Sequence, residues 1–248
     1  MDPIHQFEII NLFPIARIGG TEIAFTNSAV FMLIALLLIV LLMLVATRSR
    51  ARVPGRLQSI AEMSYEFIAA TLRSTAGPEG MEFFPLVFSI FMFILALNVI
   101  GIIPYTFTVT SHIIITVSFA LLVFLTVVIY GFWKNGLRFM KLFVPSGIPI
   151  YVLPLVTFIE VMSFLSRPVS HSVRLFANMM AGHIALKVFG GFVTMLGAFG
   201  VLGWLGGIVP LGLTVALTAL ELLVAVLQAY VFAILTCIYL NDAIHPGH

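Results

Sequence analysis

The sequence has 248 residues, of which 9% are charged and 61% are hydrophobic, and its mean hydropathy is +1.18. Because a soluble domain carries about 25% charged residues, this chain cannot cover a water-exposed surface and is an integral membrane protein. The formal net charge of +2 offers no basic surface for nucleic acid, and the single cysteine, Cys237, excludes a disulfide framework.

The first apolar run lies between Glu22 and Arg48 and holds 25 uncharged residues. A spanning helix needs about 20, so the run predicts a transmembrane helix over 27–47 that follows an outer N-terminal segment, 1–26. A cleaved signal peptide is the alternative. The preceding residues are acidic rather than basic, which favours a retained helix.

The segment after this helix has an amphipathic pattern. In RLQSIAEMSYEFIAATLR (56–73), apolar residues recur at helical spacing and the charged residues lie elsewhere on the helical wheel. The pattern predicts a helix over 54–76 that lies on the membrane surface.

A stretch of 51 uncharged residues separates Glu82 from Lys134 and is broken near its middle by Gly101 and Pro104. Since this length suits two membrane crossings, the stretch predicts a transmembrane hairpin. Its two helices are expected at 83–103 and 111–133.

The rest of the apolar chain predicts two long helices, 148–190 and 208–240, with the break among the glycines from Gly190 to Gly207. At about 1.5 Å per residue each helix exceeds the roughly 30 Å hydrocarbon core. We therefore expect a hairpin of strongly tilted, membrane-embedded helices, which makes the fold class an all-α integral membrane protein.

Basic residues indicate the orientation, because short cytoplasmic loops are rich in Lys and Arg. They gather after the first and third spans, at Arg48, Arg50, Arg52, Arg56, Arg73, Lys134, Arg138 and Lys141. Five passes then place the N-terminus outside and the C-terminus inside.

Ionisable residues within the long helices are the candidate site. They are Glu160, Arg167, His171, Arg174, His183, Lys187 and Glu221. A charge at membrane depth costs about 3 kcal/mol or more, so such residues usually line a cavity or pathway. Lys187 and Arg167 have the alternative of lying at an interface, whereas Arg174 is about 20 residues from either end of its predicted helix.

Helical geometry places these residues on faces. One sector of about 60° contains Glu160, Ser163, Arg167, His171, Arg174 and Asn178, and beside it lie the small residues Ala177, Ala181 and Ala185. Small residues predict close approach of a partner helix. On the last helix, Glu221, Ala225, Gln228 and Tyr239 share a side.

The residue types suit different roles in ion transport. Arg174 keeps its proton at any accessible pH, so it can attract an anion or repel a cation but cannot relay protons. His183 and Glu221 can both titrate when moderately perturbed. The pattern therefore suggests two polar half-channels, offset in depth and separated by a permanent cation.

Three runs of the sequence resemble the a subunit of F-type proton-translocating ATP synthases. They are SRPVSHSVRLFANMMAGHIAL at 166–186, ELLVAVLQAYVFAILTCIYL at 221–240 and LNVIGIIPYTF at 97–107. The resemblance covers essentially the whole chain. The order of His183 before Glu221 is similar to the alphaproteobacterial and mitochondrial type.

The resemblance implies roles in proton translocation. Arg174 matches the essential stator arginine, with Asn178 and Gln228 as polar neighbours. His183 and Glu221 match the outer half-channel. The remaining candidates are Glu160 and Ser170, which match the inner half-channel, and His171 and Tyr239 on the polar helix faces.

The implied function is that of a non-catalytic stator subunit in the bacterial inner membrane, with the mitochondrial inner membrane as the alternative location. Its expected partners are a rotating ring of c subunits, b-type subunits of the peripheral stalk, the lipid bilayer and the transported H⁺. No cofactor or metal is expected, and no P-loop motif is present.

Some of these residues would also suit two other functions. A secondary transporter also uses intramembrane charges, but no internal repeat is visible. An intramembrane hydrolase could use Ser163 or Ser170 near His171, but adjacent Ser and His on a polar helix more often serve packing or a water path. Transport of H⁺ rather than Na⁺ stays open, because the ion site would lie mostly on the ring.

Overall fold

The computed structural model describes residues 8–18, 21–48, 55–103, 106–144, 149 and 151–246. Its α-helices are α1 (Asn27–Arg48), α2 (Arg56–Ala76), α3 (Phe84–Ile102), α4 (Ile113–Asn135), α5 (Leu153–Gly197) and α6 (Val201–Ile244). The described residues also contain the short 3₁₀ helices η2 (Glu79–Phe83), η3 (Val109–Ser111) and η4 (Gly136–Phe143). Among the described residues, five helices are long and apolar enough to cross a membrane, and the predicted fold class, an all-α integral membrane protein, is confirmed.

The N-terminal segment contains two strands that the sequence analysis did not predict. Strand β1 (Asn11–Ile18) pairs antiparallel with β2 (Thr21–Thr26). Asn27 joins this hairpin to α1, because its side chain accepts a hydrogen bond from the backbone N–H of Ile10 and donates one to the carbonyl of Glu8.

The long helices run farther than predicted. Helix α5 ends at Gly197 and α6 begins at Val201, so the break is three residues long rather than extending from Gly190 to Gly207. Glycines are tolerated within helices that water does not reach. The chain turns at Gly200, whose φ of +76° is a left-handed conformation open to glycine.

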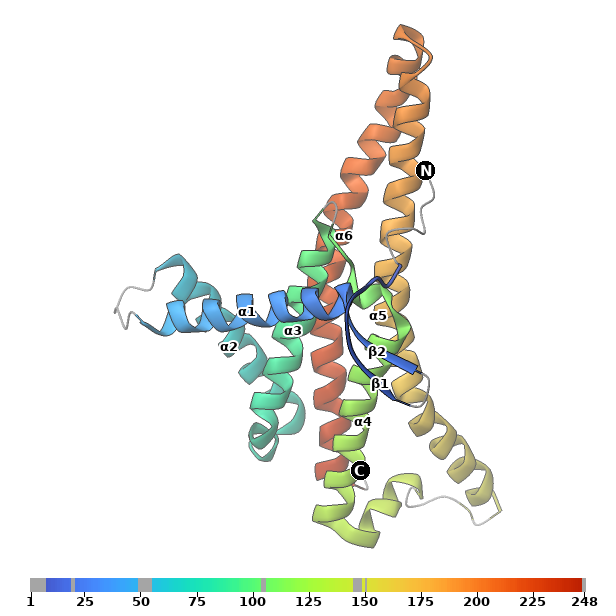
Figure 1. Cartoon of the computed structure of the whole chain (residues 1–248). Helices are drawn as coiled ribbons and strands as arrows, with labels where there is room; N and C mark the ends of the chain where they lie inside the picture. Colours follow the sequence, from blue (N-terminus) through green and yellow to red (C-terminus); the bar gives the residue numbers. More distant parts are fainter. Residues whose placement is uncertain are drawn as a thin grey trace. The chain divides into compact units, whose positions relative to one another are not determined.

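The residues form two compact units, each made of three stretches of chain. Unit 1 comprises Met1–Ile39, Phe93–Ile113 and Leu175–Gln228. Unit 2 comprises Val40–Met92, Ile114–Arg174 and Ala229–His248. In unit 1 the second part of α5 and the first part of α6 form the hairpin drawn in orange in Figure 1.

The core of unit 2 is aromatic. The buried ring of Phe139 on η4 lies against Phe132, Phe143 and Phe164, with ring centroids 5.0 to 6.3 Å apart. Asn135 at the end of α4 donates a hydrogen bond of 2.6 Å to the carbonyl of Ala243 on α6. These contacts hold the end of α6 in unit 2.

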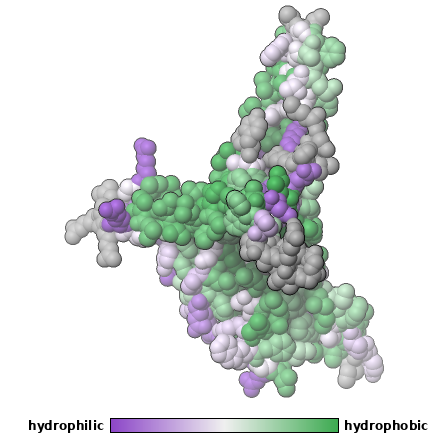
Figure 2. All heavy atoms as spheres, viewed as in Figure 1, coloured by the Kyte–Doolittle hydropathy of each residue, from purple (hydrophilic) through white to green (hydrophobic). Residues whose placement is uncertain are grey.

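Large apolar side chains are exposed along the candidate spans. On α1, Leu33, Leu37 and Leu44 are each 55 to 60% exposed, and Figure 2 shows an almost entirely hydrophobic surface along this helix. On α2, Ile68 and Leu72 are buried while Leu57 and Ile60 are exposed. A surface this apolar requires lipid or partner subunits around it.

The predicted basic cluster after α1 is only partly described. Arg50 and Arg52 lie outside the described residues, as does Pro104 in the turn after α3. Near the end of α4, Lys134 forms an ion pair with Glu79 of η2, with 2.5 Å between Nζ and Oε2.

Candidate functional site

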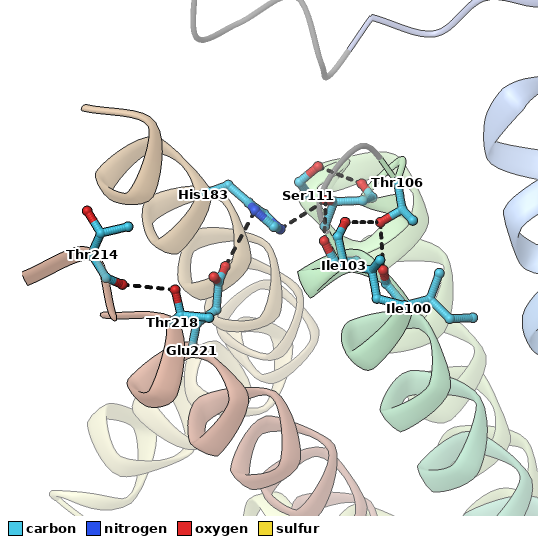
Figure 3. Close-up of polar contacts among 10 residues, drawn as sticks. Ile100, Ile103, Thr106, Ser111, His183, Thr214, Thr218 and Glu221 are labelled. Atoms are coloured by element: carbon cyan, nitrogen blue, oxygen red, sulfur yellow. Dashed lines mark hydrogen bonds and ion pairs between the residues drawn. The ribbon is translucent and has the colours of Figure 1, made fainter. Parts of the chain in front are cut away.

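The centre of the candidate site is a buried ionisable pair, His183 on α5 and Glu221 on α6. Both side chains are buried, and Nδ1 of the imidazole lies 3.5 Å from Oε1 of the carboxyl group. Figure 3 shows the two side chains pointing toward each other. The distance suits an ion pair or a proton transfer after a small movement, and it exceeds a good hydrogen bond.

The carboxyl group of Glu221 is unusual for a buried acid. Neither of its oxygens has a hydrogen-bond partner among the described residues. Burying an ionised carboxylate without such partners is costly. The group must therefore take up a proton or receive a partner from outside the chain, and both suit a site that exchanges protons.

Gly182 provides the space in which this carboxyl group lies. A Cβ atom built on Gly182 would be 2.8 Å from Oε1 of Glu221 and 3.2 Å from its Cδ. Any other residue at position 182 would have to push the acid away from the backbone of α5.

On the function that the sequence resemblance implies, we expect Gly182→Ala to lower proton flux about tenfold, because displacing a reacting group by about 1 Å costs this much or more. The measurement is ATP-driven acidification of membrane vesicles. Gly191→Ala is the matched control, since a Cβ there meets nothing within 4 Å. Equal flux in the two variants would contradict the prediction.

A third side chain contacts the pair from a different segment. The hydroxyl of Thr108, between α3 and η3, lies 2.9 Å from Nε2 of His183. Sequence reasoning missed Thr108, because a threonine in a connecting segment carries no distinctive signal and the LNVIGIIPYTF run ends one residue earlier.

Further polar pairs join the same unit. Asn98 on α3 donates a hydrogen bond of 3.2 Å to the carbonyl of Ala225. Asn178 on α5 donates one of 2.9 Å to the side-chain oxygen of Gln228 on α6. Two of the predicted polar neighbours, Asn178 and Gln228, are thus in direct contact.

An open cleft of about 790 Å³ reaches this site. Its polar and charged lining residues are Glu8, Asn27, Thr106, His183, Lys187, Thr214 and Thr218. Lys187 follows His183 by one helical turn and therefore lines the cleft wall. The cleft is large enough for many water molecules, so it can connect the His183–Glu221 pair to an aqueous phase.

A neighbouring histidine is a weaker candidate. His112 stacks on Phe107, with ring centroids 4.9 Å apart. Burial lowers the pKa of His112 below its usual value, because desolvation disfavours the charged imidazolium.

The other predicted residues lie in unit 2. Those of the predicted polar sector on α5 do not share one environment, because some are buried and others are exposed. Arg167 turns inward and forms an ion pair with Asp242 of α6, with 2.6 Å between Nη1 and Oδ2. Its guanidinium also lies over the ring of Tyr239, 4.9 Å from the centroid. His171 is buried, with its ring edge against Phe232. Arg167 therefore has a structural partner that sequence reasoning did not identify.

Ser170 and Arg174 are exposed instead, and Glu160 is partly exposed. In the described part of the chain, Arg174 has no ion pair or hydrogen bond. Tyr239, predicted on the same side of α6 as Glu221 and Gln228, lies beside Arg167 and His171. Side chains in one sector of α5 differ in exposure, because different segments of the chain pack against the helix at each turn.

A buried acid and imidazole joined between long apolar helices, beside an open cleft, define a membrane protein with an ionisable intramembrane site. The family model described as "ATP synthase A chain" matches residues 29–241. The chain is 72% identical over 247 residues to "ATP synthase subunit a" of Rhodopseudomonas palustris strain TIE-1, covering 100% of this chain and 99% of the relative.

Two further relatives carry the same description. The one from Nitrobacter hamburgensis is 69% identical and the one from Bradyrhizobium diazoefficiens is 70% identical, with 100% of this chain covered in both. The chain belongs to the ATP synthase A chain family. It is a non-catalytic, multi-pass subunit of the membrane sector, and the catalytic sites for ATP lie on other subunits.

Proposed function

We propose that this subunit carries protons through two offset half-channels and couples their flow to rotation of a ring of c subunits. The observation that carries the proposal is the buried His183–Glu221 pair beside an open cleft. Each proton that crosses gains about 2.3 kcal/mol per 100 mV of membrane potential. The subunit must let protons enter and leave without a direct leak.

The outer half-channel begins at the cleft. A proton reaches His183, passes to Glu221 and then moves along α6 to the level of Gln228 and Asn178. The 2.9 Å hydrogen bond between these two amides orients them toward a carboxyl group presented by a c subunit. An acid and an imidazole that exchange protons titrate as one unit.

Arg174 separates the two half-channels. Its guanidinium is exposed on α5 and free to meet a ring carboxylate. A fixed cation favours the ionised form of an approaching carboxyl group, so the proton is released. The same charge repels hydronium that would otherwise cross directly between the half-channels.

The inner half-channel uses residues of unit 2. Glu160 and Ser170 supply an acid and a hydroxyl that are accessible from outside the chain. The buried His171 and the half-buried Tyr239, whose ring centroids are 5.8 Å apart, complete this path. The Arg167–Asp242 ion pair holds α6 in place beside them.

The decisive experiment removes the buried acid while keeping its shape. We expect Glu221→Gln to abolish ATP-driven proton pumping, because an amide cannot take up and release a proton. Glu66→Gln on the exposed side of α2 is the matched control and should pump normally. Normal pumping by an assembled Glu221→Gln complex would refute the outer half-channel.

The proposed orientation has the N-terminus outside and the C-terminus in the cytoplasm, and the proposed partners include b-type stalk subunits. Pro3→Cys and Pro246→Cys, each in a Cys237→Ser background, should be labelled by a membrane-impermeant maleimide from opposite sides of intact membranes. Labelling of both from the same side would indicate an even number of passes.

A further inference from the structure

We propose that Thr108 is a positioning residue whose hydroxyl is the hydrogen-bond partner of Nε2 of His183 in both proton arrangements of the His183–Glu221 pair. The inference rests on the proposed role of the His183–Glu221 pair. Its basis is the contact of 2.9 Å between Oγ1 of Thr108 and Nε2 of His183. Nδ1 on the other side of the ring faces Glu221, so the imidazole lies between a hydroxyl and an acid.

The hydroxyl of Thr108 is held by its surroundings. Thr108 is fully buried, and its carbonyl accepts a hydrogen bond of 2.6 Å from the hydroxyl of Ser111. The methyl group of Thr108 packs closely on Gly101, where a Cβ would be 2.9 Å from Cγ2 of Thr108. A buried residue with its backbone hydrogen-bonded and its methyl group packed loses little further entropy when its hydroxyl contacts the imidazole.

The hydroxyl hydrogen has two acceptors within reach. One is Nε2 of His183, and the other is the carbonyl oxygen of Gly101, 3.5 Å from Oγ1. A hydroxyl is both a donor and an acceptor, so Thr108 can match either neutral form of the imidazole. Valine could match neither form, although it has nearly the same shape.

The two arrangements differ by one proton on the pair. In the first, Thr108 donates to Nε2 and Nδ1–H points at the carboxylate of Glu221. In the second, Nε2–H donates to Thr108, the hydroxyl points at Gly101, and Glu221 is a neutral acid facing Nδ1. The change takes up one proton at Nε2 and passes one from Nδ1 to Glu221, so the imidazole is neutral before and after.

The hydroxyl of Thr108 therefore stays a hydrogen-bond partner of Nε2, as donor in one arrangement and as acceptor in the other. Without the hydroxyl, Nε2 loses this contact in both states. Losing a buried hydrogen-bond partner costs free energy, so at least one step of the relay should become slower.

The test compares three variants of the whole complex in membrane vesicles. We expect Thr108→Val to lower ATP-driven proton flux about tenfold, which corresponds to about 1.4 kcal/mol, and Thr108→Ser to retain flux near the wild-type level. Thr110→Val is the matched control. Thr110 is also fully buried, but its hydroxyl has no partner in the described part of the chain, so this variant should pump normally.

The outcomes distinguish this inference from the proposed function. Normal flux in Thr108→Val, or an equal loss in Thr108→Ser, overturns the role of the hydroxyl, while a defect in Glu221→Gln would still support the half-channel. An equal loss in Thr110→Val indicates general disruption and also overturns it. Assembly is followed by the amount of the subunit in the purified complex. If Thr108→Val does not assemble, Thr108→Ala replaces it, with the same loss of flux expected.

Discussion

Replacing Arg174 by lysine is expected to abolish ATP-driven proton pumping, although the formal charge is kept. An ammonium group can lose its proton when desolvated, and it lacks the planar fork with which a guanidinium binds a carboxylate. Arg174 is exposed on α5 and has no ion pair or hydrogen bond to the described residues, so the substitution should not disturb folding. The measurement is acidification of vesicles after addition of ATP.

Arg73→Lys at the exposed end of α2 is the control and should pump normally. Arg174→Ala should also stop pumping, and it should increase passive proton leak by joining the two half-channels. Wild-type pumping in Arg174→Lys would contradict the role of the arginine as the separating cation.

The second large effect concerns the exchange of the buried pair. His183→Glu or Glu221→His alone leaves two groups of one kind at the site, and each should lower proton flux at least tenfold. General acid–base groups contribute about this much or more. The double exchange His183→Glu with Glu221→His restores one acid and one imidazole, so it should retain more flux than either single variant.

The structure supports this expectation through the 3.5 Å contact between the two side chains. Equal assembly of all three variants is the control, measured as subunit content of the purified complex. A double variant no better than the worse single variant would contradict the paired relay. It would favour fixed roles for His183 and Glu221, with Thr108 or Gly182 tuned to one of them.

The sequence alone determined the class of the protein and predicted five apolar spans, the number that the described residues contain. Its low charge requires a membrane environment, and the lengths of the first three apolar spans fit the thickness of the bilayer. Helix α1 agrees with its predicted range to within one residue. The runs at 166–186 and 221–240 also indicated the family, which the comparisons confirm.

Bilayer thickness gave no guide to the ends of the long helices or to the N-terminal strands. Glycines break helices in water, so Gly190 to Gly207 suggested a wide break, yet the structure turns only at residues 198–200. The strands β1 and β2 are short, and the membrane imposes no length on them.

The tertiary structure alone decided which polar residues meet. A helical wheel placed Arg167, His171 and Arg174 on one face, but Arg167 pairs with Asp242, His171 is buried and Arg174 is exposed. Thr108 joins the site from 75 residues away in the chain. Periodicity reports only the direction of a side chain from its own helix axis, whereas a contact depends on what the rest of the chain places opposite it.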